Sequence, residues 1–331
     1  MHLNIKKGLS LRYLFKFICF SLAMILLTSC SNEPQPLLKV GANQWPGYEP
    51  MFLARKIGLY DQHKIKLVEL PSATESIHLL QIGALDAAAL TLDETLLTIQ
   101  HNTALSIILI FDISDGADVL LAKPNIKNLH DLKGKRIGVE SSAVGATMLF
   151  SALKHAKLKE SDIKVVYLTV DEHVSAYKEG LVDAVVTFEP AATALSKQGA
   201  HVLFNSHMIP NHIIDVLAVR TEQLERQGAN IQLLVDGYYR AREFMRKQPE
   251  QAIHLIAPRL NLTPAETVNA FHGLKLPSLT ENKALFSGNP SIFDKSSISV
   301  LSMLKQAGLI KKSDIDISQL QNSHFIKASR L

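Results

Sequence analysis

The hydrophobic pattern from Leu37 onward alternates short apolar runs with longer segments whose apolar residues recur at helical spacing. Such runs are typical of buried strands, and their alternation with helices predicts an α/β fold with mostly parallel sheets. Beyond about Thr221 the pattern becomes mainly helical. The strands that we predict are 39–43, 66–70, 86–90, 105–111, 136–140, 163–168 and 183–187.

Polar residues mark the ends of several predicted helices. Ser72 with Glu75 and Thr91 with Glu94 fit the capping box, in which side chains bind the first free backbone amides of a helix. Gly83 fits a left-handed residue that ends a helix. These signals place Ser72 and Thr91 between a strand and the helix that follows it.

An internal repeat appears when the chain is compared with itself at an offset of 97 residues. Val40-Gly41 recurs as Ile137-Gly138, and the motif Gly83–Ala87 recurs as Gly180–Ala184. Each copy begins at the start of a predicted strand. It ends at a glycine that closes a predicted helix and is followed by another strand. The repeat predicts two similar α/β lobes with a cleft between them.

The first 29 residues have the composition of a secretory signal. Basic residues precede an apolar run over 17–27, which is shorter than the roughly 20 residues that a membrane-spanning helix needs. The run ends in Leu27-Thr28-Ser29-Cys30, which resembles the lipobox of bacterial lipoproteins. We expect signal cleavage, lipidation of Cys30 and a tether over 30–36; the alternative is an ordinary signal cleaved nearby, which leaves a free thiol. Ser31 favours the outer membrane over the inner.

Removal of this signal changes the charge balance. The whole chain has 35 Lys and Arg against 31 Asp and Glu, and the signal contains four of the basic residues and no acid. The remainder is therefore formally neutral, which gives no support for nucleic acid as a partner. Cys19 leaves with the signal, so Cys30 is the only remaining cysteine and no internal disulfide, zinc site or redox pair is expected.

Ligands of open α/β sheets bind beyond the carboxyl ends of the strands. No Lys or Arg immediately follows a predicted strand, which argues against a strongly anionic ligand held by side-chain cations. A small anionic group still finds backbone amides where a helix begins at Ser141-Ser142-Ala143.

Residues at these strand ends also have structural interpretations. Trp45 and Tyr48 can pack in a core, and Ser72 and Thr91 can act only as caps. Glu189 can be salt-bridged, although a ligand contact is favoured because an unpaired carboxylate is costly within an apolar run. For most of the acidic residues we expect a solvated face or hinge pairing rather than a cation or metal site; they are Asp93, Glu94, Asp112, Asp115 and Asp118.

The chain resembles the sulfonate, taurine, nitrate and thiamine-precursor binding proteins of ABC importers, often called the NMT1/THI5-like or SsuA-like group. The resemblance covers roughly residues 37–260. The motifs that carry it are Gln44-Trp45-Pro46-Gly47-Tyr48, Leu53-Ala54-Arg55-x-x-Gly58-Leu59, Gly83-Ala84-Leu85-Asp86-Ala87-Ala88, Asp131-Leu132-Lys133-Gly134-Lys135-x-Ile137-Gly138-Val139 and Gly180-x-x-Asp183-Ala184-x-x-x-x-Glu189-Pro190.

The resemblance implies a type II periplasmic-binding fold, in which two lobes are joined by two crossing strands and close on a ligand. The crossings would fall near 114–116 and 214–216. Residues 37–115 and 216–331 would then form the first lobe, and 116–215 the second.

The resemblance also implies roles for particular residues. The family's aromatic residue after the first strand matches Trp45, its anion-binding helix start matches Ser141-Ser142, and its acidic residue before proline matches Glu189. An amine would face Glu189 or Asp215, and we prefer an amine-bearing or neutral ligand over nitrate. The candidate ligand-binding residues are Trp45, Tyr48, Ser72, Thr74, Thr91, Asp112, Ser141, Ser142, Glu189 and Asp215.

We therefore expect a monomeric, membrane-anchored periplasmic protein that delivers a small polar solute to an ABC permease, without a cofactor or metal. The solute would be sulfonate-like, taurine-like or an amino-pyrimidine. One alternative is a sensor that presents its closed form to a membrane signalling receptor. A less favoured one is a pyrimidine-synthesis enzyme of the THI5-like kind, because those enzymes are cysteine-rich and cytosolic and this chain has no nucleophile elbow, P-loop or HExxH motif.

Overall fold

A computed structural model describes residues 36–311 and 315–330. Residues 37–331 belong to one compact unit. The expected signal sequence, Cys30, Ser31 and all of the tether except Pro36 lie outside the described residues. Among the residues that are described, every helix is too short or too polar to cross a bilayer.

The first sheet has six strands in the order β11-β4-β10-β3-β1-β2. Strands β1, β2 and β3 pair in parallel, whereas β10 runs antiparallel to both β3 and β4, and β11 runs antiparallel to β4. The strands are β1 Leu38–Ala42, β2 Ile65–Glu69, β3 Ala87–Thr91, β4 Leu105–Ser114, β10 Ile214–Arg220 and β11 Leu274–Lys275.

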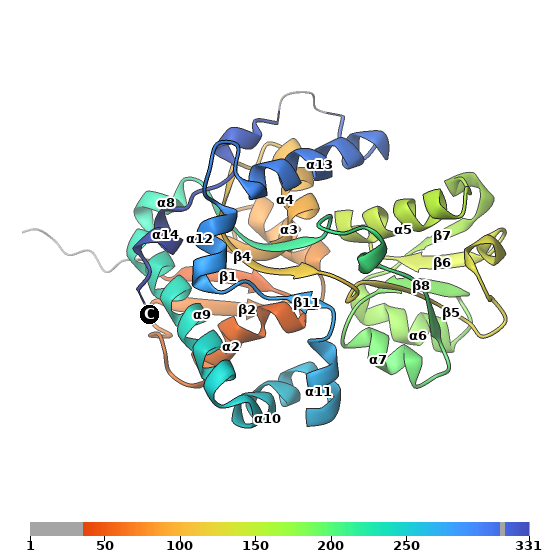
Figure 1. Cartoon of the computed structure of the whole chain (residues 1–331), viewed down its shortest axis with the longest axis horizontal. Coiled ribbons are helices and arrows are strands. Elements are labelled where there is room, and N and C mark those ends of the chain that lie inside the picture. Colours follow the sequence, from red (N-terminus) through yellow and green to blue (C-terminus); the bar gives the residue numbers. More distant parts are fainter. Residues whose placement is uncertain (1–35, 312–314, 331) are drawn as a thin grey trace, which may run out of the picture. The chain divides into compact units, whose positions relative to one another are not determined.

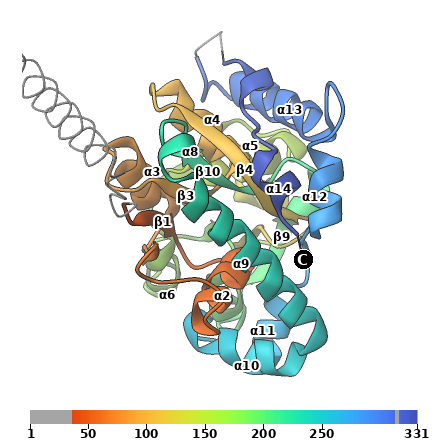
Figure 2. The ribbon, with the colours of Figure 1, turned by 90° about the vertical axis from the view of Figure 1, so that its left-hand side faces the viewer.

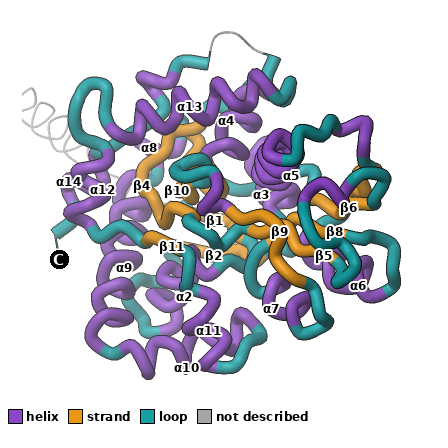
Figure 3. Tube along the Cα trace, turned by 45° about the vertical axis from the view of Figure 1, so that its right-hand side comes forward, coloured by secondary structure: helices purple, strands orange, loops and turns teal. Residues whose placement is uncertain are grey.

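The second sheet has five strands in the order β7-β6-β8-β5-β9. Strands β7, β6 and β8 pair in parallel, and β5 runs antiparallel to both β8 and β9. Figure 3 shows these strands and those of the first sheet with helices around them. The strands are β5 Val119–Ala122, β6 Arg136–Val139, β7 Lys164–Tyr167, β8 Ala184–Thr187 and β9 His201–Asn205.

Helices cover both sheets (Figure 1). Those of the first lobe are α2 Glu49–Lys56, α3 Ala73–Gln81, α4 Leu92–Gln100, α8 Gln223–Arg226, α9 Gly228–Lys247, α10 Pro249–Leu260, α11 Pro264–Ala270, α12 Leu279–Leu285, α13 Ile292–Gln306 and α14 His324–Ala328. Those of the second lobe are α5 Ala143–His155, α6 His173–Lys178 and α7 Ala191–Ser196. The helical character expected beyond Thr221 is confirmed, apart from the short strand β11.

The repeat seen in the sequence is also present in the hydrogen bonding of the two sheets. Val40 pairs with Ala87 in the first sheet, and Ile137 pairs with Ala184 in the second. The backbone amide of Lys39 donates to Asp86 (2.8 Å), and that of Arg136 donates to Asp183 (3.0 Å). Every one of these residues matches its counterpart at the offset of 97, so the two lobes share one local design.

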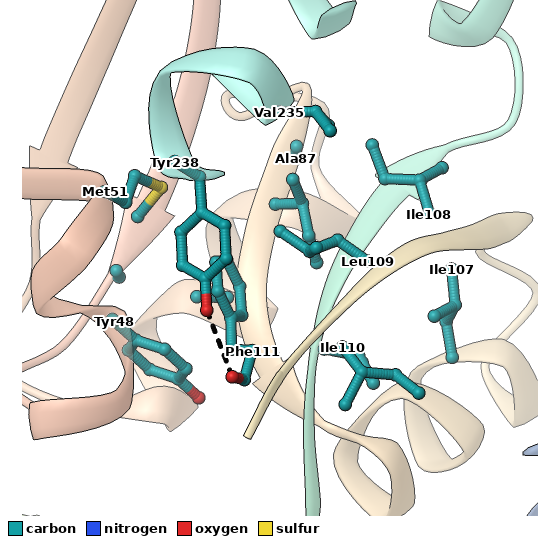
Figure 4. Packing of buried hydrophobic residues seen from close by; sticks show 14 of the residues in the cluster. Tyr48, Met51, Ala87, Ile107, Ile108, Leu109, Ile110, Phe111, Val235 and Tyr238 are labelled. Carbon is teal, nitrogen blue, oxygen red and sulfur yellow. Dashed lines mark hydrogen bonds between the residues drawn. The ribbon is translucent and has the colours of Figure 1, made fainter. Parts of the chain in front are cut away.

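The core of the first lobe lies on both faces of its sheet. Figure 4 shows Tyr238 of α9 between Met51 and the strands, with its hydroxyl donating to the carbonyl oxygen of Phe111 (3.1 Å). Helix α9 packs beside α2 (Figure 2). A separate apolar cluster, which includes Leu80 of α3 and Leu90 of β3, covers the other face.

In the second lobe, alternation along β5 divides the core into two clusters. Leu120 and Ala122 pack with α5 on one face, whereas Val119 and Leu121 pack with α6 and α7 on the other. This is the period-2 pattern of a strand that is buried on both faces.

The expected α/β fold with two sheets is confirmed, and each sheet is mixed because one crossing strand runs against its neighbours. Ile214 and Asp215 already pair with β4 in the first sheet, so the chain enters that sheet at 214 rather than 216. The strands that the pattern did not predict are β5, β9, β10 and β11.

The two copies of the repeat differ in the cations beside the aspartate, and this difference is testable: Asp183 pairs with Arg136 and also, at 3.7 Å, with Lys123. Asp183 also accepts from the Arg136 guanidinium at 3.1 and 2.8 Å, which lowers the pKa of Asp183 to about 2. Because the folded pKa lies below the unfolded value, this stabilisation is present above about pH 4 and is lost as the pH falls toward 2. Asp183→Asn should lower the unfolding free energy by about 1 kcal/mol at pH 7 and by about half as much at pH 3, which lies midway between the folded and unfolded pKa values.

Urea denaturation at both pH values measures this effect. Asp86→Asn is the matched control, because Asp86 accepts from the corresponding backbone amide without a bound arginine. Equal losses for the two variants at pH 7 would contradict the role given to Arg136.

Candidate functional site

Six acidic residues are buried where the two lobes meet, and we call them the acid cluster. Each of these residues is at most 4% exposed. Two hydrogen bonds that join the lobes pass through the cluster, from Thr147 of α5 to Asp93 (2.6 Å) and from Thr74 to Glu140 (2.8 Å). The members are Asp93, Glu94, Asp112, Asp118, Glu140 and Asp215.

Asp112 and Asp215 form the centre of the acid cluster because they lie opposite each other on β4 and β10. The amino end of β10 meets the carboxyl end of β3 here, and Asp215 is also paired with Thr91. Carboxylates directly opposite on neighbouring strands repel each other. The sheet therefore brings together two acids whose negative charges oppose each other.

Two aromatic residues from the segment after β1 bind these carboxylates. The indole N–H of Trp45 donates to Asp112 Oδ2 (3.0 Å), and the hydroxyl of Tyr48 donates to Asp215 Oδ1 (2.5 Å). The other oxygen of each carboxylate, Oδ1 of Asp112 and Oδ2 of Asp215, is buried without a donor. Each acid is thus held from one side and has one free acceptor.

Gly47 allows this close approach. A Cβ at Gly47 would lie 1.7 Å from Asp112 Oδ2 and 2.7 Å from Trp45 Nε1. Any side chain here would displace the carboxylate from the indole. The motif Gln44–Tyr48 therefore places an aromatic donor on either side of a residue that leaves room for Asp112.

Glu94 and Asp118 extend the acid cluster on either side. Glu94 closes a capping box, in which its Oε2 accepts from the Thr91 amide (2.9 Å) while its Oε1 has no partner. Asp118 follows the first crossing, where its amide donates to Ser114 Oγ (3.3 Å), and its Oδ2 is also without a donor. Both acids lie within electrostatic reach of Asp215.

Burial without a compensating cation raises the pKa of these acids. Desolvation, followed by the charge of Asp93, raises the pKa of Asp118 to about 7 and that of Glu94 to about 8. Desolvation also raises the pKa of Asp112 and Asp215, and their mutual interaction couples the two groups. The acid cluster therefore retains protons at a pH where exposed carboxyl groups have lost them.

Buried aromatic rings pack beside the acid cluster. Trp45 meets Phe188 of the second lobe edge to face at 5.3 Å, and Tyr48 meets Phe111 at 5.2 Å. Beyond Phe188 lies a cavity of about 810 Å³ whose walls come from both lobes. Its lining includes Gln44, Pro71 and Arg259 from one lobe and Asp171 and Phe188 from the other.

The structure brings together five of the predicted site residues. Trp45, Tyr48, Asp112 and Asp215 form the hydrogen-bonded centre described above, and Thr91 lies beside Asp215 on β3. The capping expected of Thr91 is confirmed. Their role in ligand binding stays a prediction.

Ser72 and Thr74 lie at a second part of the acid cluster. Ser72 caps α3, as expected, by accepting from the Glu75 amide (3.2 Å). Thr74 donates through its amide and hydroxyl to Oε1 of Glu140, whose Oε2 is buried without a donor. These residues connect α3 to the end of β6 across the two lobes.

The remaining predicted residues lie apart from the hydrogen-bonded centre. Ser141 is exposed and lines a separate cavity of about 650 Å³, while Ser142 is the N-cap of α5 and its buried hydroxyl has no partner. Both carboxylate oxygens of Glu189 accept from Thr193, at 3.0 and 2.9 Å. Glu189 therefore binds its own helix rather than the acid cluster.

The expectation of a solvated face was wrong for four of these acids, each at most 4% exposed: Asp93, Glu94, Asp112 and Asp118. Asp115 forms ion pairs with His207 (2.7 Å) and Lys275 (2.6 Å), and its role at a hinge stays a prediction. Glu140 was missed because the expected strand was extended over it. The capping box was the one sequence signal that fixed the position of Glu94.

Among residues 36–311 and 315–330, no three His, Cys, Asp or Glu side chains are arranged to hold a metal ion. The acid cluster therefore differs from a chelating site, because its carboxylates do not converge on one point. Its free oxygens instead lie on the adjacent strands β4 and β10, on helix α4, just before β5 and just after β6.

Two sheets of equivalent strand order, each completed by a strand that arrives from the other lobe, define the type II periplasmic-binding-protein fold. The chain belongs to the NMT1-like family, whose model matches residues 31–259. The resemblance and the fold class expected from the sequence are thus confirmed.

Two similar proteins have names that describe them as binding proteins for sulfonates or taurine. A putative aliphatic sulfonates-binding protein of Escherichia coli is 26% identical over 268 residues, which cover 79% of this chain and 83% of the relative. A taurine-binding periplasmic protein of the same organism is 24% identical over 257 residues, covering 75% of this chain and 77% of the relative.

Solved structures share the fold. The alkanesulfonate-binding protein of Xanthomonas axonopodis pv. citri, bound to MOPS, has a TM-score of 0.73 at 19% identity and covers 88% of this chain and 99% of its own. A desulfurization enzyme has a TM-score of 0.63 at 17% identity, and the match covers 88% of this chain and 98% of the enzyme chain. The fold is therefore found both in a binding protein and in an enzyme.

The raised pKa values predict that the ligand-free protein is more stable in weak acid. The folded pKa values lie above the unfolded values near 4, so the stabilising protons are lost as the pH rises through about 7 to 8. Between the unfolded pKa near 4 and the folded pKa, each group changes the stability by up to about 1.4 kcal/mol per pH unit. Desolvation lowers the pKa of buried His173 to about 4, so this one group loses stability as the pH falls and opposes the effect of the several acids.

Thermal melting of the ligand-free protein should therefore give a higher midpoint at pH 5 than at pH 8. Glu94→Gln should reduce the difference, because it removes one of the responsible groups. A midpoint that is equal or higher at pH 8 would contradict the protonation of the acid cluster.

Proposed function

We propose that this chain is an extracytoplasmic solute-binding protein that captures a small polar solute between its lobes and delivers it to an ABC import permease. The observation that carries this proposal is the set of buried, unpartnered acceptors where both crossings meet the first sheet. Unpaired buried polar atoms cost free energy, and a bound solute supplies the missing partners. The names of the sulfonate-binding and taurine-binding relatives support a binding role over a catalytic one.

Capture follows from contacts that exist only when the lobes are together. Thr147 with Asp93, Thr74 with Glu140, and Lys197 with Glu266 (2.6 Å) each join one lobe to the other. A solute that contacts both lobes adds to these interactions in the closed form alone. Binding therefore shifts the population of open molecules toward the closed form that a permease recognises.

The only tryptophan of the chain provides a direct test. Because the Trp45 indole binds Asp112 and contacts Phe188, solute binding should change Trp45 fluorescence. The purified protein would be titrated with taurine, alkanesulfonates, aminopyrimidines, nitrate and polyamines. A solute at about 100 times its dissociation constant adds roughly 2.7 kcal/mol to stability, so melting temperature gives a second measurement.

At least one of these solutes should change both signals. Gly47→Val, which forces Asp112 away from Trp45, should abolish the response, whereas Gly58→Ala is a control at a glycine whose Cβ would meet no neighbour. The control carries its own backbone strain, since Gly58 has φ +72°, so folding of both variants is checked by circular dichroism. A broad screen without any response would contradict the proposed function.

We further propose that Cys30 carries a lipid that anchors the protein in the periplasm, with Ser31 directing it to the outer membrane. The name of the taurine-binding relative places that protein in the periplasm. Cys30→Ser should move the protein from the membrane fraction to the soluble periplasmic fraction in an immunoblot, without changing its melting temperature. Retention of Cys30→Ser in the membrane fraction would contradict the anchor.

A further inference from the structure

We infer that the solute is a small organic cation with N–H donors, a primary ammonium or an amidinium, held by Asp112 and Asp215 with Glu94 and Asp118 beside them. This inference rests on the proposed function and names the chemical class of its solute. It differs from what the names of the relatives suggest, since sulfonates are anions.

The free oxygens of the acid cluster provide the first argument. Oδ1 of Asp112, Oδ2 of Asp215, Oε1 of Glu94 and Oδ2 of Asp118 are buried and have no partner. An ionised carboxylate can only accept, so these atoms require donors. Trp45 and Tyr48 already fix the other oxygen of the central pair, which leaves the free acceptors in defined positions.

The charge balance provides the second argument. In the part of the chain that the structure describes, no ion pair includes a member of the acid cluster. Arg242 acts on Asp112 only at a distance, because its guanidinium donates to the carbonyl oxygens of Leu276 and Pro277. Ionisation of these buried carboxyl groups is costly without a cation, and a negative group brought beside them increases that cost. A cationic solute removes this penalty, and a sulfonate would add to it.

The donors around the central pair define which cation fits. The edges of Trp45 and Tyr48, rather than their faces, meet the carboxylates through N–H and O–H groups. A quaternary ammonium, which is recognised by aromatic faces, has no hydrogen to give to the free oxygens. An ammonium or amidinium group supplies several donors and forms charge-assisted hydrogen bonds. A metal ion does not match, because the carboxylates do not form a chelating set among the described residues.

Four probes test the inference with Trp45 fluorescence and isothermal titration calorimetry: 1,4-diaminobutane, benzamidine, tetramethylammonium and ethanesulfonate. At least one of the first two should bind, and at least ten times more tightly than tetramethylammonium, while ethanesulfonate should not bind. Because the acid cluster holds protons without solute, binding of the cation should release protons, seen as an enthalpy that depends on the ionisation enthalpy of the buffer.

Two variants locate the cation. Asp215→Asn and Glu94→Gln should each weaken binding of the cation at least tenfold. Neither should lower the melting temperature of the free protein, because the amide oxygen can still accept from Tyr48 or from the Thr91 amide, and the group that is costly to ionise is removed. Asp61→Asn, in the exposed turn before β2, is the matched control and should leave the affinity unchanged. If one of the two variants does not fold, the other still tests the site. Unchanged affinity in both would overturn the assignment of the site.

The outcomes separate this inference from the proposed function. Binding of ethanesulfonate without binding of either N–H cation overturns the cation inference and leaves the solute-binding function standing. Equal affinity for tetramethylammonium and 1,4-diaminobutane overturns the requirement for N–H donors. Failure of these probes and of the broad screen described above overturns both the cation inference and the proposed function.

Discussion

The pairing of β4 with β10 is the interaction on which the rest of the structure depends. Both strands lead into the crossings between the lobes, and they lie side by side in the first sheet. Asp112 and Asp215 sit opposite each other at the end of this pair, immediately before one crossing and immediately after the other. A change in the charge of this carboxylate pair is therefore a change where the chain passes between the two lobes, and under the proposed function binding and closure would act on the same few residues.

The acid cluster is a local departure from an otherwise ordinary core. Around it the chain follows the usual rules: apolar strands are buried on both faces, and helices begin with capping side chains. At the cluster, carboxylates with free oxygens lie where apolar or paired groups would be more stable. Such conflicts between local stability and composition are expected at functional sites. The end of β4 is thus a place where the composition of the chain works against local stability.

Much of the fold could be predicted because it depends on local signals. The helix caps at Ser72 and Thr91 follow from residues three positions apart, and the repeat placed Val40 and Ile137 at equivalent positions. Strand β5 could not be placed, because its four apolar residues are recognisable only through their pairing with β8 and β9.

The candidate site was predictable in part for the same reason. Four of its residues lie at or near strand ends, and ligands of open α/β sheets bind beyond such ends: Trp45, Tyr48, Asp112 and Asp215. Asp93 resembles any acid in the first turn of a helix, and only packing against α5, which lies 50 residues further along the chain, buries it. Glu189 illustrates the opposite case, since a threonine four residues away binds a carboxylate that appeared free.

The crossing strand β10 also has a consequence for the order in which the protein can fold. The first sheet is not complete until residues 214–220 are available, because β10 lies between β3 and β4. All of the second sheet lies earlier in the chain than β10. During synthesis the second lobe can therefore assemble first. Until β10 has been made, β3 and β4 of the first lobe lack the strand that lies between them. The first lobe, and the acid cluster that includes Asp215 of β10, therefore cannot form before the whole second sheet has been made.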